Sequence, residues 1–332
     1  MPNLSLISVT GFLLLLSPPT LIHGGQHSED PAFTVADTQT HTMFSAGQKP
    51  AVRVPSGSLV EMYTHEATGG QFAFGADNED LQNVDFGRVH TMTGPVYVEG
   101  AEPGGVLAVE VVKVEVADWG WMALLPQFGV FAGEINSTSM RTFKIDHKKN
   151  AVVFNDEISV PLKPFAGIMG VAPAPGEPLD TFPPRENGGN MDNPALVEGT
   201  TVYFPVFTEG ALFSIGDTHA VQGFGEVSGT ALEAPMRIVV RLSAVQDARP
   251  IREPQYETDS YYATTGFATT LEEAARKATR YMIDYLMAEK GLSEDDAYLL
   301  CSIAGDLLIP QMVDLPNMSV TMHMPKNIFL KK

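Results

Sequence analysis

Hydrophobic periodicity changes late in this chain, and that change limits the folds open to it. In the first half, apolar residues alternate with polar ones, as in Val106 to Val116, between segments rich in proline and glycine. Helical spacing appears only late. Thr270 and Glu273 form a capping box that begins a predicted helix over 271–290. A second helix is predicted over 294–309, so the pattern indicates a β-dominated α+β protein.

Composition agrees with a large, turn-rich globular protein. The chain has 332 residues with 24 prolines and 30 glycines, enough for one large or two medium domains with many short strands. Its 40 acidic and 21 basic side chains give a formal net charge of −19. Such a charge argues against nucleic acid or an anionic membrane as partner. Cys301 is the single cysteine, which excludes an intramolecular disulfide.

The N-terminal residues 1–24 are predicted to form a signal peptide. The segment from Leu4 to Leu16 is mostly apolar but too short to span a bilayer. Residues 1–28 contain no Lys or Arg, so the basic flank of a typical signal is missing. We expect cleavage near Gly24 or Gly25 and a secreted or periplasmic protein that leaves the membrane once processed. A signal that does not function would leave the protein in the cytoplasm.

One short polar stretch between two apolar segments gathers candidate functional groups. Asp217 and His219 are two residues apart on a predicted strand, so their side chains project from the same face. Gly223 and Gly225 permit a turn that returns Glu226 toward that face. The three side chains form a ligand set for a divalent metal, an acid/base cluster without metal, or the solvated face of a hairpin.

A second polar segment precedes this stretch. The prolines and glycines between Pro183 and Asn193 predict a shaped loop rather than a strand or a helix. Thr200 to Ile215 then predicts a pair of buried strands bent at Glu209 and Gly210. A hairpin of this kind would carry Asp192 toward the strand of Asp217 and His219.

These segments, in this order, resemble the acetamidase/formamidase family of amide hydrolases over roughly residues 40 to 320. The similar segments are Thr93 to Gly105, which is like the family's N-terminal signature, Arg185 to Asp192, Phe204 to Phe207, Gly210 to Ser214, and Gly216 to Val227. The resemblance implies two intimately packed β regions with a helical C-terminal portion. We place these regions at 25–165 and 166–332, as one unit. It also implies a homo-oligomer.

The resemblance further implies hydrolysis of a short linear amide, of the formamide or acetamide type, to a carboxylate and ammonia. A divalent metal would polarise the amide carbonyl and activate water. The predicted metal ligands are Asp217, His219, Asp192 and His65, the predicted general base is Glu226, and Asn190 and Gln222 are predicted to bind the substrate amide. A histidine with carboxylates suits Zn²⁺, whereas a shell richer in oxygen would favour Ca²⁺ or Mg²⁺.

Two positions depart from the family pattern. Phe224 stands where the family usually has an acidic residue, and His65 stands where an acid is frequent. If the family's acid at position 224 binds metal or substrate, the alternative function is that of a secreted binding protein. Such a protein would keep the amidase scaffold without turnover.

Overall fold

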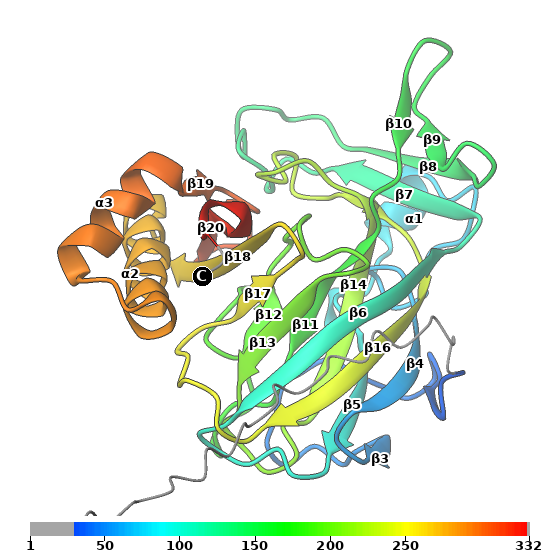
Figure 1. Cartoon of the computed structure of the whole chain (residues 1–332). Coiled ribbons are helices and arrows are strands. Elements are labelled where there is room, and N and C mark those ends of the chain that lie inside the picture. The colour runs from blue at the N-terminus through cyan, green and yellow to red at the C-terminus, as the bar shows by residue number, and fades with distance from the viewer. Residues whose placement is uncertain (1–29, 331–332) are drawn as a thin grey trace, which may run out of the picture. The chain divides into compact units, whose positions relative to one another are not determined.

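The computed structural model describes residues 30–330, and two β-sheets dominate this part of the chain (Figure 1). The first sheet has nine strands in the order β1 (Phe33–Val35), β4 (Ser58–Thr64), β16 (Met236–Val245), β6 (Val106–Val116), β13 (Thr201–Pro205), β17 (Gln255–Glu257), β18 (Tyr261–Ala268), β20 (Met318–Pro325) and β19 (Asp306–Leu308). All neighbouring strands in it run antiparallel except β1 and β4, which are parallel.

The second sheet has eleven strands and positions the candidate site. Its main path is β10 (Ser159–Pro161), β9 (Ala151–Val153), β8 (Ser139–Asp146), β7 (Trp119–Leu124), β15 (Leu232–Glu233), β14 (Phe213–Val221), β11 (Phe165–Gly170) and β12 (Gly188–Asn190). From β14 the sheet branches to β5 (Met92–Val98), which also pairs with β2 (Thr40–His41) and β3 (Val52–Val54). Because β14 pairs with β11, β15 and β5, its side chains lie at the centre of the sheet.

The main hydrophobic core takes side chains from both sheets. Met62 of β4 and Val240 of β16 belong to the same buried cluster as Met169 of β11 and Ile215 of β14, and all four are at most 1% exposed. Alternation along each strand produces this core, because every second residue faces the opposite sheet. Burying each such side chain contributes roughly 1.5–3 kcal/mol.

Helices lie mainly near the C-terminus. The longest is α2 (Leu271–Lys290), capped by the Thr270 hydroxyl at its start and by left-handed Gly291 at its end. It packs against β18 and β20 and is followed by α3 (Glu294–Ala304), which contacts α2 and β20 (Figure 1). The other α-helix of the described residues is the short α1 (Asn78–Gln82). The predicted β-dominated architecture with late helices is therefore confirmed.

Three local expectations differ from the structure. The second predicted helix ends at Ala304 instead of 309, because Asp306–Leu308 pairs with β20 as strand β19. The loop predicted between Pro183 and Asn193 contains strand β12, which pairs with β11.

The predicted hairpin over residues 200–215 is also wrong, because its two strands belong to different sheets. Here β13 pairs with β6 and β17, whereas β14 pairs with β11, β5 and β15. Phe204 and Phe213 instead pack against each other in the core, with ring centroids 6.0 Å apart and ring planes inclined by 56°. Burial of two apolar segments is compatible with packing between sheets as well as with pairing inside one.

Contacts within the chain group Pro31–Lys332 into one unit. Strands from before and after the predicted boundary at 165/166 alternate in the first sheet, where β6 lies between β16 and β13. The predicted signal peptide over 1–24 lies outside the described residues. Across residues 30–330, none of the helices has the length and apolar character needed to cross a membrane.

Candidate active site

Strand β14 carries Asp217 and His219 into the interior, where they are 4% and 1% exposed. His219 Nε2 lies 3.5 Å from Asp217 Oδ2. Asp217 has a left-handed backbone, with φ of 46°, and its carbonyl lies close to Gly167 of β11. A side chain at Gly167 would stand 2.3 Å from Asp192 Oδ1 and 2.8 Å from His219 Cε1. A glycine is thus required there for the two polar segments to meet.

The turn predicted after β14 is present. Gly225 has φ of 100°, and the backbone N–H of Glu226 donates to the Gly223 carbonyl at 3.2 Å. Glu226 is only 7% exposed, and a carboxylate oxygen of it lies within 4.8 Å of ligand atoms on Asp192 and His219. The turn therefore returns the Glu226 side chain to the cluster.

The segment after β12 supplies the next two groups. Asn190 and Asp192 are each 1% exposed, and Asp192 Oδ1 lies 3.8 Å from His219 Nδ1. The backbone N–H groups of Met191 and Asp192 both donate to the Gly167 carbonyl. These bonds hold Asp192 in a left-handed conformation, with φ of 39°. Backbone strain of this kind is retained where the surrounding structure enforces it, frequently at functional sites.

Gln222 determines which nitrogen of His219 carries a proton. Its Nε2 donates to the backbone carbonyls of Asp192, at 2.8 Å, and Pro310, at 3.2 Å. Since a carbonyl oxygen only accepts, this orientation of the amide is fixed and Oε1 faces His219 Nδ1 at 2.8 Å. Nδ1 therefore carries the hydrogen and donates it to Gln222.

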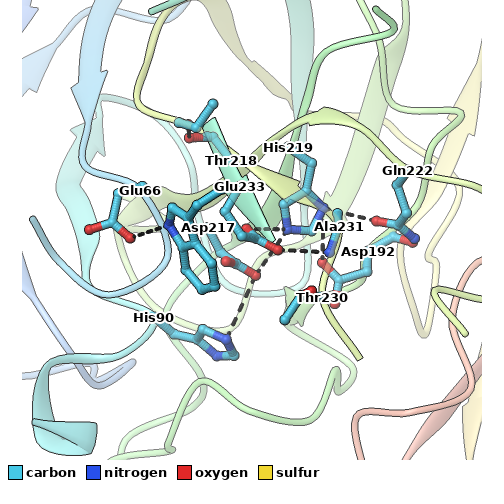
Figure 2. Close-up of polar contacts among 12 residues, drawn as sticks. Glu66, His90, Asp192, Asp217, Thr218, His219, Gln222, Thr230, Ala231 and Glu233 are labelled. Carbon is cyan, nitrogen blue, oxygen red and sulfur yellow. Dashed lines mark hydrogen bonds and ion pairs between the residues drawn. The ribbon is translucent and has the colours of Figure 1, made fainter. Parts of the chain in front are cut away.

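The opposite nitrogen of the imidazole faces negative charge. His219 Nε2 lies 3.1 Å from Glu233 Oε2 as well as 3.5 Å from Asp217 Oδ2, without an aligned hydrogen bond to either. Figure 2 shows His219 between Gln222 on one side and these two carboxylates on the other. A lone pair aimed at two carboxylate oxygens is repelled, so Nε2 must hold either a proton or a cation.

Unpaired polar atoms concentrate around one small cavity. Among residues 30–330, six buried side-chain atoms have no hydrogen-bond partner: His90 Nδ1, Asn190 Oδ1, Asp192 Oδ1, His219 Nε2, Glu233 Oε2 and Asp314 Oδ2. Five of these residues line a cavity of about 80 Å³, together with Asp217 and Glu226. The sixth, His219, lies beside two of the carboxylates that line it, Asp217 and Glu233. Buried polar groups are normally satisfied, so such a concentration indicates a site built for a ligand.

Comparison with known proteins identifies the scaffold. The profile of the Acetamidase/Formamidase family matches residues 29–179 and 175–331. The chain belongs to the acetamidase/formamidase family. It is 25% identical to a formamidase of Methylophilus methylotrophus over 88% of this chain and 90% of that one. This amidase membership confirms the predicted amide hydrolysis at the level of the family.

Solved structures of amidases agree with this assignment. A predicted acetamidase/formamidase from Thermoanaerobacter tengcongensis is 32% identical, with a TM-score of 0.85, and the match covers 89% of this chain and 96% of that one. An acetamidase from Bacillus halodurans is also 32% identical, with a TM-score of 0.84, over 89% and 98% of the two chains. The resemblance to this family, stated above from the motifs, is confirmed.

Charge in the amidase cluster is unbalanced, and the pKa values record it. Burial, followed by the negative charge of Asp314, raises the pKa of Asp192 well above its usual value. Burial and the charge of Asp192 do the same to the pKa of Glu226. For Asp217, burial opposes ionisation, but the positive charge of His90 and His219 outweighs it and lowers the pKa to about 2. Within residues 30–330, the ion pairs of these carboxylates are made with histidine alone.

His219 and Glu233 show the same competition. Burial opposes the charged form of His219, but the carboxylates of Glu233 and Asp217 raise its pKa well above the usual value. Burial raises the pKa of Glu233 to about 7, despite the attraction of His219. No lysine or arginine of the described chain is among the residues that line the cavity. A cation at this position would offset the excess of carboxylates.

The structure gathers five of the seven predicted site residues as expected: Asp217, His219, Asp192, Glu226 and Asn190. Gln222 is present, but its amide is fully used by His219, Asp192 and Pro310, so it positions the histidine and is not free for substrate. Thr64, the last residue of β4, is buried, and its hydroxyl contacts Thr218. The next residue, His65, follows the end of the strand and lies outside the cluster, next to Gly70.

Three residues of the site were missed from the sequence: Glu233, His90 and Asp314. Glu233 is a single acidic residue in an apolar segment, on the two-residue strand β15, and such an isolated acid is a weak sequence signal. His90 Nε2 lies 3.8 Å from Asp217 Oδ2, and burial lowers the pKa of His90 despite that carboxylate. Asp314 is partly exposed as a residue, yet its Oδ2 is covered.

The departure at Phe224 does not remove a group from the cluster. Its side chain is 43% exposed and lies on a different, apolar cavity. Phe224 therefore lies away from the polar cavity, and of the two features that motivate the binding-protein alternative, Phe224 and the predicted signal peptide, only the signal peptide remains.

Proposed function

We propose that this chain hydrolyses short linear amides of the formamide or acetamide type, using a divalent metal ion. The observation that carries the proposal is the set of six unpaired buried polar atoms around the small cavity. A cavity of about 80 Å³ is large enough for a small amide and water, since one water requires roughly 10–15 Å³ by this measure. The names of the related formamidase and acetamidases support the substrate class.

The residues present suit a divalent cation. His219 Nε2, Asp217 Oδ2 and Glu233 Oε2 converge, and ligand atoms of the three residues lie within 4.8 Å of one another. We assign the metal to this set, because Nδ1 of His219 is occupied by Gln222. Imidazole nitrogen and carboxylate oxygen are both donors that zinc uses in proteins, and Zn²⁺ remains the proposed ion, with Ca²⁺ or Mg²⁺ as alternatives. When bound, such an ion polarises a carbonyl and makes a neighbouring water easier to deprotonate.

The other side chains bind and move protons. Asn190 Oδ1 has no partner and lines the cavity, so it can accept a hydrogen bond from the substrate amide. Glu226, which also lines the cavity, takes a proton from water as the water oxygen adds to the carbonyl carbon. The same carboxyl returns the proton to nitrogen as the C–N bond breaks. The products are one carboxylate and ammonia.

A direct test measures ammonia release from formamide and acetamide. Metal-loaded protein should release ammonia and chelated protein should not, with activity restored when the metal is added back. A matched pair of variants locates the site. His219→Ala should lose metal and activity, whereas His147→Ala, an exposed histidine paired with Asp118, should keep both. Ammonia release that is unaffected by complete chelation would contradict the metal dependence.

The proposed location rests on residues 1–24 alone. If the signal is cleaved, protein recovered outside the cytoplasm should begin near Gly25 or Gln26 by N-terminal sequencing. An intact Met1 in such material would contradict cleavage. The homo-oligomer implied by the family remains a prediction, to be checked by light scattering of the purified protein.

A further inference from the structure

A second cavity adjoins the polar one. It has a volume of about 300 Å³, and Glu226 and Thr230 line both cavities. Gln222, which holds His219, also lies on its wall. The larger cavity reaches the surface at Phe224 and Val227, which are 43% and 61% exposed. Its inner wall is therefore the chain segment that carries the proposed base.

The lining of this cavity is polar at one wall and apolar elsewhere. Its polar side chains all come from residues 222–230, and Glu226 is the one charged residue among the described residues that line it. The remaining walls are formed by apolar side chains of the strands β7 to β10 and β14, including Met122, Phe143, Val152, Val160 and Val221. An apolar pocket with a few polar groups at one end is the usual form of a site for an amphipathic small molecule.

We propose that the substrates of this chain include linear amides with an apolar acyl chain of several carbons. The carboxamide would lie at Glu226 and the polar cluster, and the acyl chain would lie in the larger cavity. This inference rests on the proposed amide hydrolysis and extends its substrate class. Hexanamide and water would give hexanoate and ammonium, with a C–O bond formed, the C–N bond broken and both protons of water transferred to nitrogen.

The size of the expected effect follows from burial of methylene groups. Transfer of one methylene from water to an apolar pocket changes kcat/KM by roughly fourfold when the group is buried in the transition state. Hexanamide has four more methylenes than acetamide. If at least two of them are buried, its kcat/KM should exceed that of acetamide by roughly tenfold or more.

Two neighbouring residues of β10 provide a matched pair of variants. Val160 lines the cavity and is partly buried, whereas Ser159 is exposed and its side chain lies on the opposite face of the strand. Val160→Phe should fill the cavity and lower the ratio of kcat/KM for hexanamide over acetamide by roughly tenfold. Ser159→Phe should leave the ratio and the activity on acetamide unchanged. Val160→Thr, which keeps the volume, should lower the ratio in the same direction by a smaller factor.

The experiment measures ammonia release from acetamide, butyramide and hexanamide by the full chain, with circular dichroism and light scattering of each variant. Equal kcat/KM for all three amides would overturn the inference while acetamide hydrolysis still supports the proposed function. A Val160→Phe protein that keeps the ratio but changes its molar mass would also overturn it, because the cavity would then be covered by a second copy of the chain. Failure to release ammonia from any amide would overturn both proposals.

Discussion

Two buried carboxylates on either side of one indole show how differently this chain treats the same chemical group. Glu66 is 1% exposed and accepts hydrogen bonds from Thr68 N, Thr68 Oγ1, Gly70 N and Trp121 Nε1. Glu233 is 3% exposed and pairs in register with the same Trp121, but it accepts only from Ala231 N. Its Oε2 has no hydrogen-bond partner.

The difference separates a structural polar group from a functional one. Four donors satisfy the Glu66 carboxylate, so its burial costs little and fixes the segment from Glu66 to Gly70. Glu233 instead leaves one oxygen pointing at His219 Nε2, 3.1 Å away. A buried carboxylate that is only partly satisfied destabilises the fold unless a ligand or proton completes it. Burial alone therefore does not identify a site; incomplete hydrogen bonding does.

The largest effect should come from the general base. Glu226→Gln keeps the size of the side chain but cannot take a proton, so turnover of acetamide should fall by roughly two to four powers of ten. Metal content, measured by atomic emission, should stay close to that of the parent protein. Loss of the metal in this variant would instead make Glu226 a ligand and contradict its role as the general base.

Stabilisation of the folded protein by metal should depend on Glu233 and not on Glu66. At a free metal concentration of 100 times Kd, binding should stabilise the folded protein by roughly 2.7 kcal/mol, which raises Tm by roughly 5 °C or more. Differential scanning calorimetry with and without chelator should show this shift in the parent and in Glu66→Gln. The shift should disappear in Glu233→Gln. An equal shift in all three proteins would place the metal elsewhere.

Stability should reveal the structural role of Glu66. In Glu66→Gln, the new amide NH₂ faces donors that previously bonded to a carboxylate oxygen, which costs roughly 1–3 kcal/mol of unfolding free energy. Urea unfolding of chelated protein should show the loss, while activity on acetamide at low temperature should persist. A Glu66→Gln protein of normal stability but without activity would assign Glu66 to the chemistry.

The smallest expected effect concerns Gln222. Its amide makes hydrogen bonds to Asp192, Pro310 and His219, and it thereby orients the imidazole whose Nε2 has no partner. Gln222→Met keeps the volume and removes the acceptor for His219 Nδ1, so metal affinity should fall by roughly tenfold. The readout is a metal titration by calorimetry, independent of turnover. Gln246→Met, at an exposed glutamine bonded to the Gly100 carbonyl, is the control and should not change the affinity. Unchanged affinity in Gln222→Met would mean that His219 does not depend on this hydrogen bond.

Much of the fold and part of the site followed from local patterns. Strand alternation, the late helical spacing and the capping residue Thr270 are properties of consecutive residues, so they predicted the β-dominated architecture and the position of α2. The i, i+2 spacing placed Asp217 and His219 together, and the glycines before Glu226 predicted its turn. The resemblance to the family was likewise carried by contiguous motifs.

The remaining partners were decided by the tertiary structure. Glu233 lies on a two-residue strand, and its position opposite His219 depends on the pairing of β15 with β14, which no local pattern specifies. His90 and Asp314 reach the cavity from segments far apart in the sequence. The orientation of Gln222 depends on the Pro310 carbonyl, 88 residues later in the chain. Periodicity determines which face of a strand a side chain occupies, but the neighbour across that face is chosen by how the sheets pack as a whole.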